Sequence, residues 1–181
     1  MQILFGTTLD GCPLPPSRLG LDRVALGPAG LLALLEERLG LAPPAPSGFA
    51  RLLDYRSALE DRPGEERFFS ASLALDPLAV ARTLLAWRDE LCLAGWDGEA
   101  STDAPARLRD LAAVEVQFRD APSAGQGVAA RLRRVHRALT AGLAPGIDRL
   151  DLLDPASEFP ALWQGVLGRL PSIEGTEGRA P

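Results

Sequence analysis

The most regular pattern of apolar and polar positions in this chain lies between residues 77 and 94. At about 100° per residue, five apolar side chains fall on one stripe of a helix, with charged side chains opposite, and the stripe consists of Val80, Leu84, Trp87, Leu91 and Ala94. Asp76 is placed to cap this helix, Pro77 suits its first position and Gly95 suits its end. The pattern predicts the central core helix of a globular domain, packed through this stripe.

The same spacing predicts five more helices, over residues 28–39, 48–60, 105–118, 128–139 and 160–170. Ser47 is placed to cap the second of these, and Gly40 to end the first. Residues 68–75 fit either a helix or a strand, and a helical turn leading into Asp76 is the preferred interpretation. Helices therefore fill the middle of the chain.

Short apolar runs next to turn residues predict strands over residues 2–5, 22–26 and 147–153. Strands near both ends with helices between them are typical of an α/β fold. We therefore expect a small parallel sheet of about three strands in one domain over residues 1–170, with a large helical insertion over about 48–142. Residues 171–181 carry little that can be buried, which predicts a mobile tail.

Composition limits the possible chemistry. The chain has 181 residues, 46% of them hydrophobic, and a net charge of −5, so no global charge attracts nucleic acid. All 19 basic residues are arginine. Without lysine, the chain lacks a complete Walker A loop, a Schiff-base amine and a nuclease site of the D…(D/E)-x-K type.

Few residues are available for metal or nucleophilic chemistry. Cys12 and Cys92 match no metal-binding spacing, and two reduced thiols are the preferred interpretation over a disulfide. His136 is the one histidine, and its position beside an apolar stripe favours a structural role. We expect no catalytic residues, no metal and no cofactor. No apolar run is long enough to cross a bilayer and no signal peptide is evident, so we expect a cytoplasmic protein.

The loop after the first predicted strand resembles a phosphate-binding loop only in part. Gly6 and Gly11 have the G-x4-G spacing, but Cys12 and Pro13 stand where lysine and a hydroxyl residue are required. An ordinary turn is the preferred interpretation, and a degenerate phosphate loop is the alternative. Neither predicts ATP turnover.

Four arginines lie outside the apolar stripe of the helix over residues 128–139, namely Arg131, Arg133, Arg134 and Arg137. Arg133 and Arg137 are four positions apart on this helix, where like charges are mildly destabilising. A phosphate partner would explain why this repulsion is tolerated, so the cluster is a candidate nucleic-acid contact. The alternative is a solvated arginine face. Adjacent acidic pairs such as Glu36 and Glu37 diverge on a helix, so we expect solvated faces there rather than a general acid and base.

One buried ion pair is predicted. Arg88 lies on the apolar flank of the central helix, and Glu115 lies among the inward residues of the helix over 105–118. Helices joined by a short loop usually pack antiparallel, and a charge buried alone is costly. We therefore expect Arg88 and Glu115 to pair. The alternative partner of Arg88 is Asp89 or a backbone carbonyl.

Three stretches resemble the N-terminal part of bacterial AddB-like proteins of the PD-(D/E)XK nuclease family, namely residues 3–6, 27–41 and 75–96. The resemblance implies an inactivated first motor domain of a superfamily I helicase with a helical insertion. In that family the nuclease lies far downstream, and the phosphate loop is the feature that is absent here.

The resemblance implies a non-catalytic domain of a protein that processes DNA double-strand breaks. Such a domain contributes to the DNA path or contacts a helicase–nuclease partner subunit, and DNA is bound through the parent protein. The alternative is a stand-alone protein-interaction module with a helical binding surface. A basic groove along the Arg131–Arg137 face favours the first function, and an exposed apolar patch favours the second.

Overall fold

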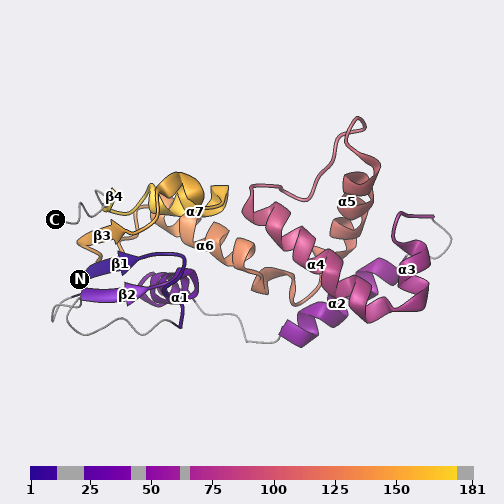
Figure 1. Ribbon diagram of the computed structural model, residues 1–181, viewed down its shortest axis with the longest axis horizontal. Coiled ribbons are helices and arrows are strands. Elements are labelled where there is room, and N and C mark those ends of the chain that lie inside the picture. Colours follow the sequence, from indigo (N-terminus) through magenta and orange to yellow (C-terminus); the bar gives the residue numbers. More distant parts are fainter. Residues whose placement is uncertain (12–22, 42–47, 62–65, 175–181) are drawn as a thin grey trace, which may run out of the picture. The chain divides into compact units, whose positions relative to one another are not determined.

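The computed structural model describes residues 1–11, 23–41, 48–61 and 66–174 (Figure 1). The chain forms two compact units. The first, here called the α/β unit, consists of Met1–Pro43 and Arg131–Pro181, and the second, the helical unit, of Pro44–Ala130. The insertion expected over 48–142 corresponds to this second unit, except that most of helix α6 (Val128–Thr140) is grouped with the α/β unit.

The sheet of the α/β unit is small and parallel, as the sequence predicts. It contains β1 (Gln2–Phe5), β2 (Arg23–Leu26), β3 (Arg149–Leu152) and β4 (Ser172–Glu174), in the order β2-β1-β3-β4 (Figure 1). β4 lies where a mobile tail was expected, so that prediction is wrong for residues 172–174. The strand is held by backbone pairing with β3 rather than by an apolar pattern of its own. Residues 175–181 lie outside the described residues.

One face of the sheet carries the core of the α/β unit. Ile3 and Phe5 of β1 align with Leu150 and Leu152 of β3, and all four side chains are buried. Phe159 stacks on Phe5 with ring centroids 5.1 Å apart, and Trp163 of α7 (Ala161–Leu167) lies 5.6 Å from the same ring. Helices α1 (Pro28–Arg38) and α6 also bury apolar residues, namely Leu31, Leu32, Leu35, Leu132 and Val135.

The opposite face of the sheet carries a polar triad. Asp151 of β3 is buried and forms ion pairs with Arg23 of β2 and with Arg149, whose Nε lies 2.7 Å from Asp151 Oδ1. Burial alone would raise the pKa of Asp151, but the hydrogen bonds and charges of Arg149 and Arg23 lower it overall. The triad ties β2 to β3 across β1, between residues far apart in sequence.

The helical unit contains α2 (Gly48–Glu60), α3 (Ser70–Leu75), α4 (Pro77–Leu93), α5 (Ala106–Phe118) and the short 3-10 helix η2 (Ala124–Gln126). Its core includes Leu52, Tyr55, Leu84, Leu111, Val114 and Phe118. The Asp76 carboxylate accepts the N–H of Ala79 at 3.0 Å, so the predicted cap of α4 is present. Ser47, expected as the cap of α2, lies outside the described residues.

The buried side of α4 coincides with the predicted stripe only in part. Its buried residues are Ala81, Leu84, Leu85, Arg88 and Cys92. Of the predicted stripe, Leu84 is buried, Val80 and Leu91 are half-buried against the core, and Trp87 is 43% exposed. The core of the helical unit meets α4 on the side of Arg88, which pairs with Glu115 of α5. Apolar surface on α4 is therefore broader than the part that the core covers.

Candidate functional site

The loop that follows β1 is closed by a carboxylate from the end of β3. The Thr7 backbone N–H and its Oγ1 both donate to Asp154 Oδ2, at 2.7 and 2.9 Å. Gly6 is buried, and a Cβ there would lie 3.0 Å from the Leu153 side chain. Because parallel strands end at the same edge, residues 147 positions apart meet at the carboxyl edge of the sheet, where open α/β sheets usually bind ligands.

A second carboxylate caps helix α1 at the same edge. The Asp10 Oδ2 and Oδ1 atoms accept the backbone N–H groups of Ala29 and Gly30, at 2.8 and 3.2 Å. A side chain at Gly27 would collide with Asp10. The first N–H groups of a helix are where a phosphate binds in a phosphate loop. Here the chain's own carboxylate takes that position.

Gly6 and Gly11 therefore stand at the two ends of a loop held by Asp154 and Asp10. Gly11 has φ +76°, which favours glycine. Two carboxylates at this edge repel a phosphate rather than attract one. Cys12 and Pro13, the other positions of the predicted loop, lie outside the described residues.

The four arginines of α6 do not form one open basic patch. Arg131 makes a bidentate pair with Glu36 of α1, with Nε 3.0 Å from Oε1 and Nη2 2.5 Å from Oε2. Arg134 Nη2 lies 3.6 Å from the same Glu36 Oε1. The hydrogen bonds that Arg131 donates to Glu36 raise the pKa of Arg131. Glu36 is only 1% exposed, so the expectation of a solvated acidic face is wrong there.

Arg137 and His136 have other surroundings. Arg137 is exposed, and its Nε lies 3.4 Å from the backbone oxygen of Arg133 on the same helix. His136 packs beside Gly165 of α7, where an added Cβ would lie 3.5 Å from the imidazole. The α6 arginines thus include two that neutralise Glu36, Arg131 and Arg134, and one that is exposed, Arg137.

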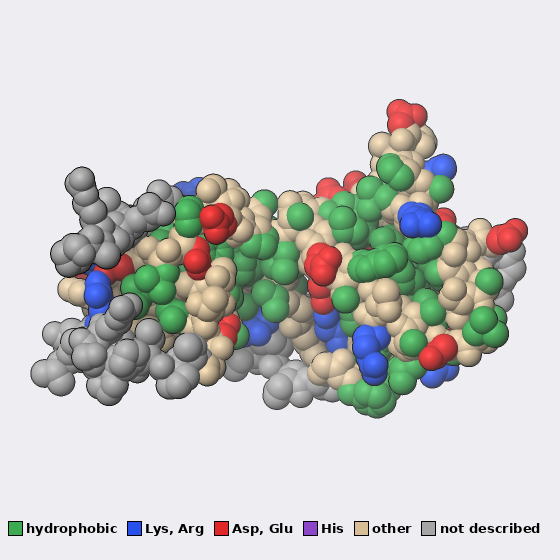
Figure 2. Space-filling view, in the orientation of Figure 1, with side chains coloured by type: hydrophobic (Ala, Val, Ile, Leu, Met, Phe, Trp, Pro, Cys, Tyr) green, Lys and Arg blue, Asp and Glu red, His purple; other side chains and the backbone are tan. Residues whose placement is uncertain are grey.

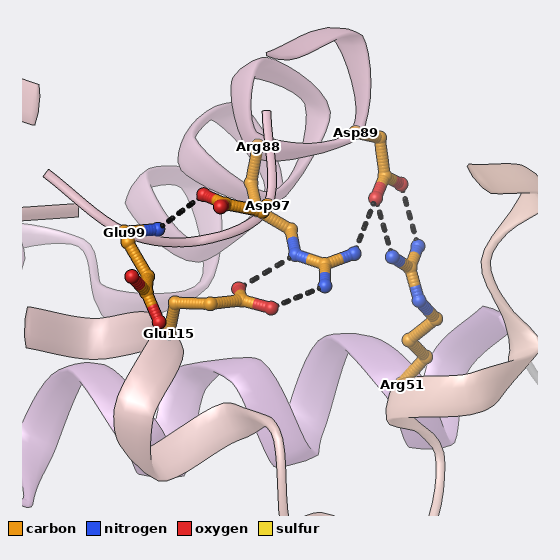
Figure 3. Close-up of polar contacts among 6 residues, drawn as sticks. All are labelled: Arg51, Arg88, Asp89, Asp97, Glu99 and Glu115. Carbon is orange, nitrogen blue, oxygen red and sulfur yellow. Dashed lines mark hydrogen bonds and ion pairs between the residues drawn. The ribbon is translucent and has the colours of Figure 1, made fainter. Parts of the chain in front are cut away.

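The most connected polar cluster lies in the helical unit (Figure 3). Arg88 Nε and Nη2 donate to Glu115 Oε2 and Oε1, at 2.8 and 2.5 Å, as the sequence predicts. Arg88 Nη1 also lies 3.1 Å from Asp89 Oδ1, and Asp89 in turn pairs with Arg51 of α2. Burial alone would lower the pKa of Arg88, but Glu115 raises it overall.

The cluster is packed closely by aromatic rings and by glycines. The guanidinium groups of Arg88 and Arg51 lie 5.1 and 5.8 Å from the centre of the Phe118 ring. A side chain at Gly98 would lie 2.6 Å from Glu115 Cγ, and one at Gly127 would lie 2.7 Å from Arg51 Nη2. Because the guanidinium groups of this cluster pair with its carboxylates, the cluster joins α2, α4 and α5 rather than offering charged groups to a substrate.

A hollow of about 240 Å³ opens between α3 and α4, and the sequence analysis did not predict it. Here called the α3–α4 hollow, it is lined by Phe68, Phe69, Ser72, Ala79, Val80, Thr83, Leu84 and Trp87. Phe68 is 38% exposed, so two large aromatic side chains of its rim reach solvent. The available signal was the breadth of the apolar surface on α4, together with two adjacent phenylalanines before α3.

The surface of the helical unit is mixed. Hydrophobic side chains gather on it between scattered acidic and basic ones (Figure 2). Trp96 packs against the core of this unit and donates its indole N–H to the Glu99 backbone oxygen at 2.6 Å. Trp87, by contrast, is exposed at the surface of this unit.

Comparison with protein-family models, with curated proteins and with solved structures gives no match for this chain. Within the described residues, no group of three or more histidine, cysteine or acidic side chains is arranged to hold a metal ion. No helix in this part of the chain combines the length and apolar character needed to span a bilayer. Function is therefore inferred from the site geometry alone.

Proposed function

We propose that this chain is a non-catalytic protein-interaction domain and that the α3–α4 hollow is its docking surface. The observation that carries the proposal is that Trp87 is exposed on α4, a helix that already packs its buried residues against the core of the helical unit. A helix that is apolar on more than one side is normally covered on each of them. The second apolar side of α4 therefore fits a protein partner.

Energetics support the same function. Apolar surface removed from water contributes roughly 25 cal/mol per Å² to binding before the costs of association. Tryptophan is the residue type most enriched among side chains that dominate interface energies. Trp87 and Phe68 together provide an aromatic rim around an apolar depression, which is the usual form of a docking site.

A nucleotide or DNA function has weaker support. The N-terminus of α1 is capped by Asp10, and Arg131 and Arg134 face the buried Glu36. Groups that neutralise the chain's own charges contribute little to binding an external phosphate. The protein-contact function accordingly has the better support of the two that the sequence suggested.

The AddB-like resemblance supplies the wider setting of the proposal. In that setting the chain is a helicase-like part of a DNA-repair exonuclease, acts in the cytoplasm and contacts protein subunits, while DNA binding and nuclease chemistry belong to other parts of the parent protein. The docking proposal itself does not depend on this setting.

Site-specific photocrosslinking in living cells tests the docking surface. A photoreactive phenylalanine analogue replaces Trp87 in the full chain, and the matched control carries it at Val116, which is exposed on α5 and outside the hollow. We expect a discrete crosslinked product from position 87 and none from position 116.

Absence of a product at position 87, or equal products at both positions, would contradict the proposal. A second variant, Phe68→Ser, is combined with the probe at position 87. Because Phe68 forms part of the rim, we expect this change to remove the crosslinked product while circular dichroism remains unchanged.

A further inference from the structure

We propose that the α3–α4 hollow receives Trp87 from a second copy of this chain, in a two-fold dimer in which Arg107 of each copy faces Glu90 of the other. The inference rests on the proposed docking function and specifies the docked protein. It uses only the helical unit.

The size of the hollow suits a protein side chain. Its volume of about 240 Å³ is below the roughly 300–1,000 Å³ of sites that enclose a small molecule. Its lining is almost wholly aromatic and aliphatic, with Ser72 and Thr83 as the polar members. The Thr83 hydroxyl already donates to the Ala79 backbone oxygen at 3.0 Å. An apolar side chain of one residue is the occupant that this lining fits.

The rim of the α3–α4 hollow itself carries an apolar side chain that could fill a second hollow, namely Trp87. Trp87 lines the hollow and is 43% exposed, so the same face holds both a depression and an aromatic group at its rim. An isologous two-fold interface needs a patch that is complementary to itself. Exchange of Trp87 between two hollows meets that requirement and buries both indoles.

The charges beside the hollow are complementary in the same way. The Arg107 guanidinium lies 5.6 Å from the centre of the Phe68 ring, and Phe68 lines the hollow. Glu90 lies one helical turn beyond Trp87, on α4. Among the described residues neither side chain forms an ion pair within its own copy. When Trp87 of one copy enters next to Phe68 of the other, Glu90 approaches Arg107.

Other acidic groups near the hollow are already engaged. The Asp76 carboxylate caps α4, and Asp110 Oδ2 accepts the Phe68 backbone N–H at 3.1 Å. Since the chain carries a net charge of −5, two copies repel at long range, and unlike charges at the contact are needed to offset this. One cation and one anion per copy give two such pairs.

Sedimentation equilibrium of the full chain tests the inference, with four variants: Trp87→Ser, Arg107→Glu, Glu90→Arg and the double reversal Arg107→Glu/Glu90→Arg. We expect a reversible monomer–dimer equilibrium for the wild type at micromolar to millimolar concentration. Trp87→Ser should abolish it, and each single reversal should weaken it about tenfold or more because like charges then meet.

The double reversal is the decisive variant. In a two-fold dimer it recreates both ion pairs with their signs exchanged, so it should restore the wild-type dissociation constant. A chain that is monomeric at every concentration would overturn the inference, and so would a double reversal weaker than either single one. A monomeric chain that still gives a crosslink to another protein from position 87 would overturn only the second-copy inference.

Discussion

Arg88 of α4 and Glu115 of α5 form a two-point ion pair inside the helical unit, with both side chains buried. Guanidinium and carboxylate meet in the parallel geometry that makes such pairs strong. Arg88 Nη1, which does not contact Glu115, donates a hydrogen bond to Asp89. The pair therefore links α4 to α5.

The first prediction concerns this pair. Glu115→Gln removes the buried, two-point counter-charge of Arg88 and leaves only its single contact with Asp89, so we expect a loss of roughly 3–5 kcal/mol in the free energy of unfolding, measured by urea denaturation. The control is Glu99→Gln, on an exposed residue of the same region, which should change stability by no more than about 0.5 kcal/mol. Replacement of both partners, Arg88→Met/Glu115→Leu, should cost less than Glu115→Gln alone.

The second prediction concerns pH. The pKa of Asp151 is lowered from 3.8 in the folded chain, so its ion pairs stabilise the fold above that pH and are lost as the pH falls through the lower folded value. Asp151→Asn should therefore destabilise the protein at neutral pH, and the difference from the wild type should shrink below pH 3.8. Asp120→Asn, an exposed control, should show no such convergence, and a difference for Asp151→Asn that is constant with pH would contradict the assignment.

The third prediction concerns the cap of α1. Asp10→Ala removes an acceptor for two backbone N–H groups, so we expect a loss of about 1 kcal/mol of stability. Asp10→Asn keeps an acceptor but loses the charge that favours a helix N-terminus, so it should fall between the wild type and Asp10→Ala. Thermal and urea unfolding measure both. Equal stability of all three proteins would show that this contact does not hold the loop.

The fourth prediction concerns DNA. Two of the four α6 arginines face Glu36, so at most two remain for phosphate contacts from this face. The logarithm of any affinity for duplex DNA should therefore change with the logarithm of salt concentration with a slope no steeper than about −2. Fluorescence anisotropy across a salt series measures this slope. A slope near −4, which needs about four contacts, would contradict the division of the face.

Local signals predicted many of the elements. The helix over 48–60 and the strand over 2–5 match α2 and β1 because caps, turn residues and apolar spacing all lie within the segment itself. The Arg88–Glu115 pair was also predictable, since each charge sits on the inward side of its own helix. An element or ion pair can therefore be predicted from the sequence when the residues that determine it lie in the same segment or on the next helix.

Distant contacts explain the errors. Glu36 looks solvated beside Glu37, but Arg131, 95 positions away, makes its burial possible. β4 has too few residues to show a pattern and depends on the backbone of β3. Periodicity located the apolar stripe of α4 but does not state which part of it the core covers, and that part determines the exposure of Trp87.

The division of the chain has a consequence for its synthesis. β1 pairs with β2 on one side and with β3 on the other, yet β3 is translated only after the entire helical unit. A growing chain therefore has all of the helical unit available for folding while one edge of β1 is still open. Such an edge is a template for wrong pairing. During the synthesis of residues 27–148, β1 and β2 have therefore left the ribosome before their neighbour β3 exists.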